Sequence, residues 1–366
     1  MNQPIRILQI NGDRRRGGGI LNVILSWHRR IDRNKVQFDY LTFLPTPTPE
    51  DCNEEIQALG GNTFYIPFSF QHPFRFIKQI YRFFKTHHYT TVHSHVTHLN
   101  FVFFPLAKWF GTKNIVQHAH GTQWGEVKSS AWRNYLMLHA VWPLITHKLA
   151  CSQAAGEFWY GKNFTVINNA VDMDKFDYNP AMRAQKRREL GVENNFVLGN
   201  VGWLTQRKNP FFLLDIFEHI IRQDASARLI WVGRGVLEEK VKALAVQKNL
   251  QDKVLLLGAR KDVAAIYQAL DVLCMPSIFE GLPVVGVEAQ AAGLPCVFAD
   301  TITPEVLLLP GSVMLSLNEP AAQWAEKILA FKNRPRVSGR EALRAKGFDV
   351  CQTARQMQDF YEQLGN

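Results

Sequence analysis

Short apolar runs alternate with longer segments of helical periodicity along the chain. The runs are bounded by Gly, Pro, Asn or Asp, which is typical of buried strands. In the first half the predicted strands are Ile5–Ile10, Phe38–Phe43, Thr63–Ile66, Thr90–His93, Asn114–His118 and Lys148–Ala150. A polar, glycine-rich loop follows the first strand and leads into a helix over Ile20–Arg30. Strands that alternate with helices predict a parallel sheet with helices on both faces.

The same alternation starts again after Asp172. The predicted strands are Phe196–Val201, Arg228–Val232, Lys253–Leu257, Val272–Met275 and Pro295–Ala299, and the helices between them are Asn209–Gln223, Leu237–Lys248, Val263–Leu270 and Pro283–Ala292. We therefore predict an α/β protein with two domains, residues 1–173 and 174–349, and a charged stretch over Tyr178–Asn195 between the two sheets. A final helix within 350–366 is expected to pack back toward the first domain. A ligand is expected in a cleft at the carboxyl ends of the strands.

The composition of the chain mainly serves to exclude some classes of protein. Of the 366 residues, 46% are apolar and 20% are charged, which excludes wholesale disorder. No run approaches the roughly 18 apolar residues of a membrane-spanning helix, and the N-terminus lacks the apolar core of a signal peptide. The five cysteines are scattered singly, without the spacing of a disulfide framework or a metal site. We expect a cytoplasmic protein.

Charge adds a hint about partners. The formal net charge is +10, and residues 1–172 carry 18 Lys and Arg against 10 Asp and Glu, so most of the excess lies there. A basic half indicates a polyanionic partner, which leaves a nucleic acid, a membrane surface and a phosphorylated substrate open. Because no nucleic-acid-binding module is recognisable, we do not expect a nucleic acid.

The strongest chemical pattern is SIFEGLPVVGVEAQAAGLP, from Ser277 to Pro295. Glu280 comes just after a predicted strand, and Gly281, Leu282 and Pro283 turn into a helix whose first amides attract an anion. Glu288 follows eight residues after Glu280. Two acids beside such a helix start suit a nucleotide sugar, whose hydroxyls would bind the acids and whose diphosphate would bind the amides. The alternative is that Glu280 caps the helix and Glu288 is a solvated surface residue.

This pattern resembles the retaining glycosyltransferases of family 4, which have the GT-B fold of two facing Rossmann-like domains with a deep cleft between them. Their pair of glutamates, with seven residues between them and an E-G-(F/L)-P context, corresponds to Glu280 and Glu288. Further matches follow in order along nearly the whole chain. They are Gly17-Gly18-Gly19, His120-Gly121, Ser152, Val166–Asp172, Val201–Asn209, Val232–Gly235, Leu257–Val263 and the more narrowly capsular or exopolysaccharide-like Asp300–Val306.

The resemblance implies an enzyme that transfers a sugar from a nucleotide diphosphate sugar, a UDP-sugar being favoured, without a metal or other cofactor. Glu288 would bind the ribose, Glu280 the donor sugar, and Lys208 the departing diphosphate. His120 would lie over the donor sugar as a third catalytic candidate. The remaining donor contacts implied are Gly18, Gly19, Arg207, Arg260 and the backbone of Gly281 and Leu282. The acceptor would be a lipid-linked oligosaccharide of a bacterial surface polysaccharide.

One departure from the family pattern bears on activity. The family usually has Arg in a G-R-(L/F) motif, where this chain has Gly202, Trp203 and Leu204. A basic phosphate contact is therefore missing, although Arg207 or Arg234 could restore the charge. Two other functions stay open at this stage: a nucleotide-sugar epimerase on the same fold, and a degenerate donor-binding or scaffold subunit.

Two basic segments of the first half are candidates for acceptor or membrane contact. Arg14, Arg15 and Arg16 precede the glycines of the first loop, where they either contact phosphates or form a solvated loop tip. The segment 74–85 has apolar residues at Phe74, Ile77, Tyr81 and Phe84 with Arg75, Lys78 and Arg82 among them. That pattern predicts a helix that lies on the inner face of the plasma membrane or, alternatively, simply covers the sheet.

Five histidines cluster in the sequence at His93, His95, His98, His118 and His120. Residues two apart on a strand share a face, so four of these side chains could converge. No carboxylate or cysteine accompanies them at ligand spacing, so we expect no metal site here.

Overall fold

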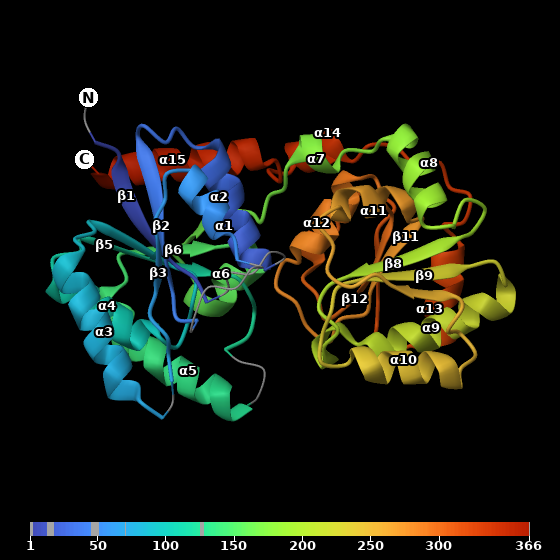
Figure 1. Ribbon diagram of the computed structural model, residues 1–366, viewed down its shortest axis with the longest axis horizontal. Helices are drawn as coiled ribbons and strands as arrows, with labels where there is room; N and C mark the ends of the chain where they lie inside the picture. Colours follow the sequence, from blue (N-terminus) through green and yellow to red (C-terminus); the bar gives the residue numbers. More distant parts are fainter. Residues whose placement is uncertain (1–2, 13–17, 45–50, 70, 125–127, 366) are drawn as a thin grey trace. The chain divides into compact units, whose positions relative to one another are not determined.

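The computed structural model describes residues 3–12, 18–44, 51–69, 71–124 and 128–365, and Figure 1 shows the course of the chain. The chain divides into two compact units, residues 1–169 with 350–366 (unit 1) and residues 170–349 (unit 2). The first boundary lies at 169/170, where the sequence predicted 173/174. A parallel bridge between Val171 and Asp349 accounts for this, because it ties the start of unit 2 to its end.

Unit 1 is built on a seven-stranded sheet in the order β3-β2-β1-β4-β5-β6-β7, in which every paired strand is parallel. The two-residue strand β7 was not predicted, because it is too short to give a periodic signal. The order reverses between β1 and β4, which makes this edge a topological switch point. The strands are β1 Ile5–Ile10, β2 Val36–Thr42, β3 Thr63–Tyr65, β4 Thr91–Ser94, β5 Asn114–Ala119, β6 His147–Ala150 and β7 Thr165–Val166.

Helices cover both faces of this sheet, with α3, α4 and α5 side by side on one face and α1 and α15 on the other (Figure 1). The final helix α15 belongs to unit 1 and packs against α1, β1 and β2. It buries Ala354, Met357 and Tyr361 on that side, at a helical spacing of three to four residues. The helices are α1 Gly19–Arg30, α2 Asn53–Ala58, α3 Pro73–Thr86, α4 Asn100–Trp109, α5 Lys128–Val141, α6 Gln153–Tyr160 and α15 Val350–Gly365.

Unit 2 contains a six-stranded parallel sheet in the order β10-β9-β8-β11-β12-β13, with its switch point between β8 and β11. Five of its strands match the predicted runs, and β13 is the addition. The strands are β8 Val197–Val201, β9 Arg228–Val232, β10 Val254–Leu256, β11 Val272–Met275, β12 Cys296–Ala299 and β13 Val313–Leu315. The helices are α7 Met173–Phe176, α8 Pro180–Glu189, α9 Pro210–Gln223, α10 Glu238–Gln247, α11 Val263–Ala269, α12 Val284–Ala291, α13 Ala321–Leu329 and α14 Arg340–Ala345.

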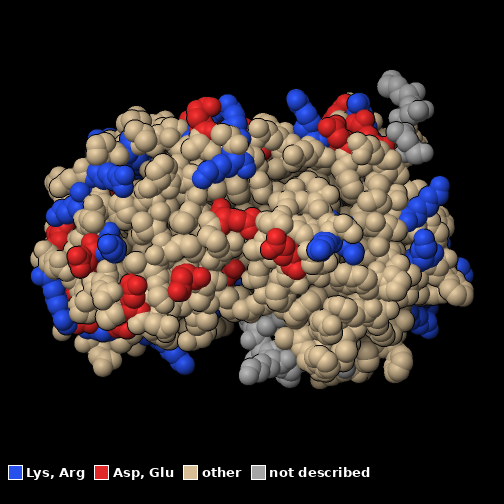
Figure 2. All heavy atoms as spheres, turned by 180° about the vertical axis from the view of Figure 1, so that it is seen from behind, with Lys and Arg blue, Asp and Glu red and all other residues tan. Residues whose placement is uncertain are grey.

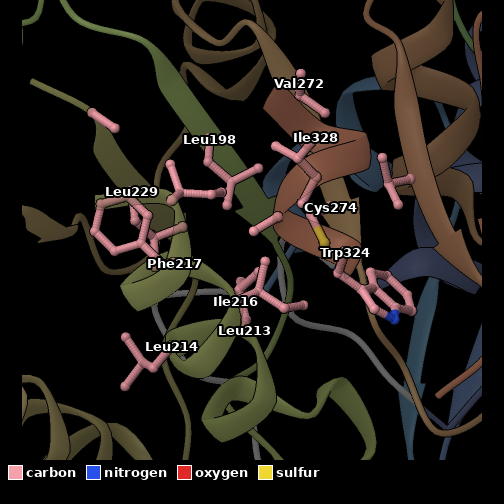
Figure 3. Packing of buried hydrophobic residues seen from close by; sticks show 14 of the residues in the cluster. Leu198, Leu213, Leu214, Ile216, Phe217, Leu229, Val272, Cys274, Trp324 and Ile328 are labelled. Carbon is pink, nitrogen blue, oxygen red and sulfur yellow. The ribbon is translucent and has the colours of Figure 1, made fainter. Parts of the chain in front are cut away.

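The core of unit 2 shows why these segments fold as they do. Helix α9 starts at Pro210, whose fixed φ suits a first helical position, and buries Leu213, Ile216 and Phe217 on one face. Figure 3 shows this face packed with side chains of β8, β9, β11 and α13 such as Trp324. Each fully buried aliphatic or Phe side chain contributes about 1.5–3 kcal/mol. This packed core therefore holds the carboxyl ends of β8 and β11 in place.

The charged stretch predicted between the sheets is instead part of unit 2. Helix α8 lies within it, and Arg183 and Arg187 of this helix form ion pairs with Asp271, which precedes β11. Nearby, Arg336 is largely buried and donates to four backbone carbonyls, from Tyr267, Gln268, Leu270 and Ala292. These guanidinium groups line a cavity of about 540 Å³ at the amino ends of the strands. Because they are engaged by protein acceptors, we interpret this cavity as structural.

Candidate functional site

The two loops at the switch point of unit 2 meet. The first follows β8 and runs through Gln206–Lys208, a short 3-10 turn, and the second follows β11 and leads to α12. The backbone amide of Ile278 donates to the carbonyl of Arg207 at 2.8 Å and joins the two loops. Asn209 then adopts the left-handed conformation, with φ of 54°, and turns the chain into α9. This joint positions the side chains of residues 207 and 208 against the second loop.

Lys208 and Glu280, which the sequence analysis assigned to different parts of the donor, form a buried ion pair. The distance from Lys208 Nζ to Glu280 Oε1 is 2.6 Å, and the side chains are only 7% and 9% exposed. Gly202 makes room for the lysine, because a Cβ at this position would lie 2.9 Å from Lys208 Cε. The positive φ of Gly202, 151°, disfavours a side chain there as well. The Glu280 carboxylate is paired with Lys208 and does not cap α12, which favours a binding role over simple capping.

Arg207 adds a second cation to the same place. Its Nη1 lies 3.8 Å from Glu280 Oε2, and its guanidinium lies over the Phe279 ring at 5.5 Å. The side chain remains 37% exposed, so it can still contact a ligand. Arg207 is therefore placed to supply the charge that Trp203 does not. Arg234, the other candidate for that task, is exposed and lies beside Gly258.

Glu288 is on the second turn of α12, and its environment differs from that of Glu280. Its Oε2 accepts a hydrogen bond of 2.9 Å from the Tyr267 hydroxyl on α11. Burial raises the pKa of Glu288 to about 7, although the Tyr267 hydrogen bond and Lys175 both act to lower it. Tyr267 is a part of the site that sequence reasoning missed, because it lies in an ordinary apolar helix pattern. Glu288 is therefore not a solvated surface residue, and its pKa is not that of an ordinary carboxylate.

The N-terminus of α12 lies between these two glutamates. Pro283 is its N-cap, and Gly281 and Leu282 form the turn that precedes it. Within the described residues no side chain caps this helix, so its first amides are not closed off by a side-chain acceptor. Such a terminus attracts an anion. Glu280, Gly281, Leu282 and Glu288 thus surround one helix start.

Arg260 is the donor-site prediction with the weakest structural support. Its guanidinium forms two 2.8 Å hydrogen bonds with Asp262, and Lys186 binds the same carboxylate. These cations hold the pKa of Asp262 well below its usual range, the Arg260 hydrogen bond contributing most. The structure joins Arg260 to this surface network, and no described contact joins it to Lys208 or Glu280.

At the carboxyl edge of unit 1, two glycines mark the start of α1. Gly18 is its N-cap and Gly19 its first residue, and no side chain caps the helix within the described part of the chain. A Cβ at Gly19 would meet no described atom within 4 Å. The fold therefore does not require a glycine there, whereas a closely bound ligand would. Arg14, Arg15, Arg16 and Gly17 lie outside the described residues.

His120 follows β5 at the same edge, and its ring packs with the rings of three buried histidines. Ring centroids lie 4.3 Å apart between His118 and His120 and 4.2 Å apart between His93 and His95. Burial lowers the pKa of His120 to about 3 and the pKa values of the other three well below their usual range. His98, the fifth histidine of the sequence cluster, is outside this stack.

Three of these side chains could also hold a metal ion. Ligand nitrogens of His93, His95 and His118 lie within 4.8 Å of one another. However, six of the eight ring nitrogens of the four histidines already have hydrogen-bond partners within unit 1, and the described cluster contains no carboxylate or thiolate. Asp172, Met173 and Asp174 form a D-x-D sequence, a pattern that can bind a metal ion. Here the Asp172 side chain instead caps α7.

Helix α3 exposes most of the apolar residues that the sequence pattern singled out. Its buried side chains are Phe76, Ile80, Phe83 and Phe84, so Phe84 alone of that apolar set is buried. The helix presents apolar and basic side chains together on its exposed surface, which we call the α3 surface. Its members are Phe74, Ile77, Tyr81, Arg75, Lys78, Arg82 and Lys85.

Further exposed aromatic residues lie on the adjacent helices α4 and α5. Trp109 is 80% exposed and Trp132 is 64% exposed. Figure 2 shows one face of the molecule, on which Lys and Arg form small separate groups with Asp and Glu among them. This face has no continuous basic surface of the kind that a nucleic-acid backbone requires.

Comparison with known proteins identifies the family. Residues 17–175 match the model of glycosyltransferase family 4, and residues 182–348 match that of the group 1 glycosyl transferases. The Bacillus subtilis protein named glycosyltransferase EpsF is 32% identical over 373 residues, which cover 97% of this chain and 96% of that protein. The chain belongs to glycosyltransferase family 4. It is thus a transferase, as predicted.

Two further similarities add detail about this glycosyltransferase. An Escherichia coli UDP-Gal:alpha-D-GlcNAc-diphosphoundecaprenol alpha-1,3-galactosyltransferase is 27% identical over 296 residues, covering 77% of this chain and 76% of that enzyme. The crystal structure of Anabaena HepE in complex with UDP and glucose has a TM-score of 0.81 at 18% identity, covering 98% and 99% of the two chains. The predicted GT-B class, two Rossmann-like units with parallel sheets, is confirmed. Among the described helices, none combines the length and apolar character needed to cross a bilayer.

Proposed function

We propose that this glycosyltransferase transfers a sugar from a nucleotide diphosphate sugar to a growing lipid-linked saccharide, with retention of configuration and without a metal. The observation that carries the proposal is the buried Lys208–Glu280 pair at the switch point of unit 2. Parallel α/β sheets bind ligands at such a point. A lysine that is already ion-paired and flanked by Arg207 is suited to receive the extra negative charge of a diphosphate.

Each group of the site has a role in this proposal. Lys208, Arg207 and the N-terminus of α12 bind the diphosphate and neutralise the charge that builds up as it leaves. Glu288 binds the ribose hydroxyls, Glu280 binds a hydroxyl of the donor sugar, and the turn at Gly281 and Leu282 allows close approach. Because Lys208 and Arg207 bring positive charge to the leaving group, the reaction does not need a divalent cation.

The way Glu280 is held bears on the route by which configuration would be retained. A carboxylate that is ion-paired with Lys208 is a poor nucleophile, which supports attack on the front face rather than a covalent enzyme intermediate. The acceptor hydroxyl oxygen then bonds to the anomeric carbon while the bond from that carbon to the phosphate oxygen breaks. The electron pair of that bond leaves with the diphosphate, which also takes up the acceptor proton.

Unit 1 contributes the remaining groups. Gly18 and Gly19 let the backbone approach the donor phosphates, consistent with the open space beside Gly19. His120 lies over the donor sugar. We favour a UDP-sugar, because the E. coli relative is named for UDP-Gal and the HepE crystals contain UDP.

The proposed acceptor is an undecaprenyl-diphosphate saccharide of a bacterial surface polysaccharide, reached at the cytoplasmic face of the membrane. The name of the E. coli relative contains a diphosphoundecaprenol. The α3 surface supports a peripheral position, because exposed Phe74, Ile77 and Tyr81 can enter the lipid headgroup region while Arg75, Lys78 and Arg82 bind anionic lipid.

The donor is tested with a thermal-shift panel of nucleotide diphosphate sugars, with and without EDTA, followed by transfer and donor-hydrolysis assays. A donor at 100 times its Kd stabilises the folded state by about 2.7 kcal/mol. We expect a shift with one donor, insensitive to EDTA, lost in Glu288→Ala and kept in Glu326→Ala, an exposed glutamate on α13. Loss of the shift with EDTA contradicts metal independence, and donor conversion without transfer favours an epimerase.

The membrane proposal is tested by flotation with vesicles of phosphatidylcholine alone or with phosphatidylglycerol. We expect binding to the anionic vesicles and several-fold weaker binding of the double variant Phe74→Ser/Ile77→Ser. Val236→Ser/Val337→Ser is the matched control, because it removes two exposed apolar side chains of unit 2. Equal binding to both kinds of vesicle, or equal loss in both variants, contradicts the assignment of this surface.

A further inference from the structure

Aromatic side chains form a continuous row along helix α5 of unit 1, which we call the aromatic stripe. Because its members follow one another at alternating spacings of three and four residues, they share one side of the helix. Ring centroids of neighbours along the stripe lie 5.7, 3.9 and 5.1 Å apart, in chain order. At the far end Lys148 Nζ lies over the Trp142 ring, 4.7 Å from its centroid. The members of the stripe are Trp132, Tyr135, His139 and Trp142.

Trp124, in the loop that follows β5, joins the aromatic stripe to helix α6. Its ring centroid lies 5.2 Å from that of Tyr135 and 4.4 Å from that of Trp159 on α6. The ring of Phe158, also on α6, lies 5.4 Å from Trp124. Rings from three segments of the chain therefore hold one another in fixed orientations.

The stripe lies at the surface rather than in the core. Trp132 is 64% exposed, and Phe158 is 40% exposed. Aromatic residues at helical spacing usually mark the side of a helix that packs on a sheet. In α5 a different side is buried, the one that carries Asn134, Leu138 and Val141. The packing of α5 therefore does not account for the exposed rings.

The stripe begins beside the carboxyl edge of the unit 1 sheet, the edge at which parallel sheets bind ligands. Two hydrogen bonds hold the loop after β5 in place there. Trp159 Nε1 donates to the Gly121 carbonyl at 2.6 Å, and Asn134 Nδ2 donates to the Trp124 carbonyl at 2.7 Å. A Cβ at Gly121 would meet no described atom within 4 Å, so a ligand can approach this loop closely.

His139 adds a polar contact to the stripe. Its Nδ1 lies 2.8 Å from the Tyr135 carbonyl, which can only accept, so this nitrogen carries the hydrogen. In the neutral ring Nε2 is then an acceptor, and the His139 side chain is exposed. The stripe thus offers aromatic faces together with a hydrogen-bond acceptor. A sugar has the complementary features, because the C–H groups of its ring are attracted to an aromatic face and its hydroxyl groups can donate.

The charges beside the stripe distinguish it from the α3 surface. Helix α3 has four basic residues on its exposed surface and no acidic one, which suits an anionic membrane. Among the described side chains of α5 and α6, the charged ones besides His139 are Arg133 and Glu157, of opposite sign. A surface without an excess of either charge favours a neutral partner, and a neutral saccharide fits it better than an anionic lipid headgroup.

We infer that the aromatic stripe, with Trp124 and Phe158, binds sugar rings of the acceptor, which stack on the exposed rings while a sugar hydroxyl donates to His139 Nε2. The inference rests on the proposed function, in which the acceptor is a growing saccharide. From Trp132 to His139 the helix rises about 10 Å, so the stripe is longer than a single sugar ring. It gives the saccharide part of the acceptor a place in unit 1, whereas the α3 surface contacts the membrane.

The first test measures KM for the lipid-linked acceptor in the transfer assay, with the full chain. Trp132→Leu keeps an apolar side chain but loses the aromatic face, so we expect KM for the acceptor to rise about tenfold and KM for the donor to change less than about twofold. Trp132→Phe restores an aromatic face and should stay within about threefold of the wild type. An unchanged acceptor KM in Trp132→Leu, or equal increases in the two variants, overturns the inference.

Trp109→Leu is the matched control. This tryptophan is 80% exposed and is the last residue of α4, which runs from the carboxyl edge of the sheet back to its amino edge. We expect its acceptor KM to equal that of the wild type. Weaker flotation of Trp132→Leu with phosphatidylglycerol vesicles overturns the inference in favour of lipid contact. A dimer that Trp132→Leu dissociates, measured by light scattering, overturns it in favour of contact between two copies of the chain.

The second test does not depend on turnover. Saturation-transfer NMR with the methyl glycosides of glucose, galactose and N-acetylglucosamine reports the binding of free sugars to the full chain. We expect signals from the C–H protons of at least one of them, reduced several-fold in Trp132→Leu and kept in Trp109→Leu. Signals that do not depend on Trp132 overturn the inference.

The two tests separate this inference from the proposed function. A chain that binds sugars through Trp132 but transfers none defeats the proposed function. A chain that transfers sugar with the same acceptor KM in the wild type and in Trp132→Leu defeats the inference alone.

Discussion

The two units have the same kind of sheet and the same kind of switch point, yet they place opposite chemistry there. In unit 2 the switch point holds formal charges: Lys208 and Arg207 each lie within 4 Å of Glu280. In unit 1 it holds four stacked histidines that burial keeps neutral. A shared fold therefore supplies only the place, and the side chains decide whether that place binds phosphate charge or orients hydroxyl groups.

The largest expected effect comes from acid, which should separate the units. Histidines with lowered pKa are neutral in the folded chain but take up protons when unfolded, so unit 1 loses stability as pH falls below about 6.5. Between pH 7.5 and 5.5 the loss is on the order of 1 kcal/mol for each of the four histidines and for His28, whose pKa burial lowers to about 4. Glu288 acts in the opposite direction. Because its pKa is raised to about 7, unit 2 gains about 1 to 2 kcal/mol of stability as the pH falls over the same range.

Hydrogen exchange followed by mass spectrometry, corrected for intrinsic rates, reports on each unit in the intact chain. His118→Gln should reduce the acid sensitivity of unit 1, and His88→Gln, at an exposed position, should leave it unchanged. Equal acid destabilisation of the two units would contradict the contrast between them.

Lys208→Met should cost about 100-fold or more in kcat, because it removes the cation nearest the departing diphosphate. It also leaves Glu280 buried without its main partner, so a lowered melting temperature should accompany the loss. Lys248→Met is the control, since this lysine pairs with Asp215 and Glu218 away from the site. A normal kcat for Lys208→Met would contradict the assignment of phosphate binding to unit 2.

Arg207→Met should cost about tenfold in kcat, because its guanidinium is the second cation of the site and remains partly exposed. Adding Trp203→Arg to this variant should recover part of the activity, since it restores the basic residue of the family pattern. Steady-state kinetics of the two single variants and the double variant measure this. Full activity of Arg207→Met would show that the charge comes from elsewhere.

Tyr267→Phe should have the smallest effect. Without the hydroxyl that lowers its pKa, Glu288 should ionise at higher pH, so KM for the donor at pH 7 should rise about two- to threefold and recover by pH 8.5. The pH dependence of KM measures it, with Tyr178→Phe as a control. A rise in KM that is the same at both pH values would show that the tyrosine only supports packing.

The sequence predicted both sheets because apolar runs bounded by Gly, Pro or Asp carry a local signal. It also singled out Lys208 and Glu280 as site residues through the family pattern, but their ion pair was not predicted. Tyr267 was not predicted, because it lies in an unremarkable helix and meets Glu288 only in the fold. The sequence left two alternatives open for α3, because aromatic residues occur all round this helix and periodicity alone does not select the face that packs.

The most direct test of the central claim compares the affinities of UDP and uridine for the wild type and for Lys208→Met by calorimetric titration. The difference between the two ligands is the diphosphate, so the ratio of their Kd values isolates its contribution. We expect the wild type to bind UDP far more tightly than uridine, and Lys208→Met to reduce that ratio at least tenfold while its affinity for uridine stays unchanged. An unchanged ratio would contradict the assignment of phosphate binding to this switch point.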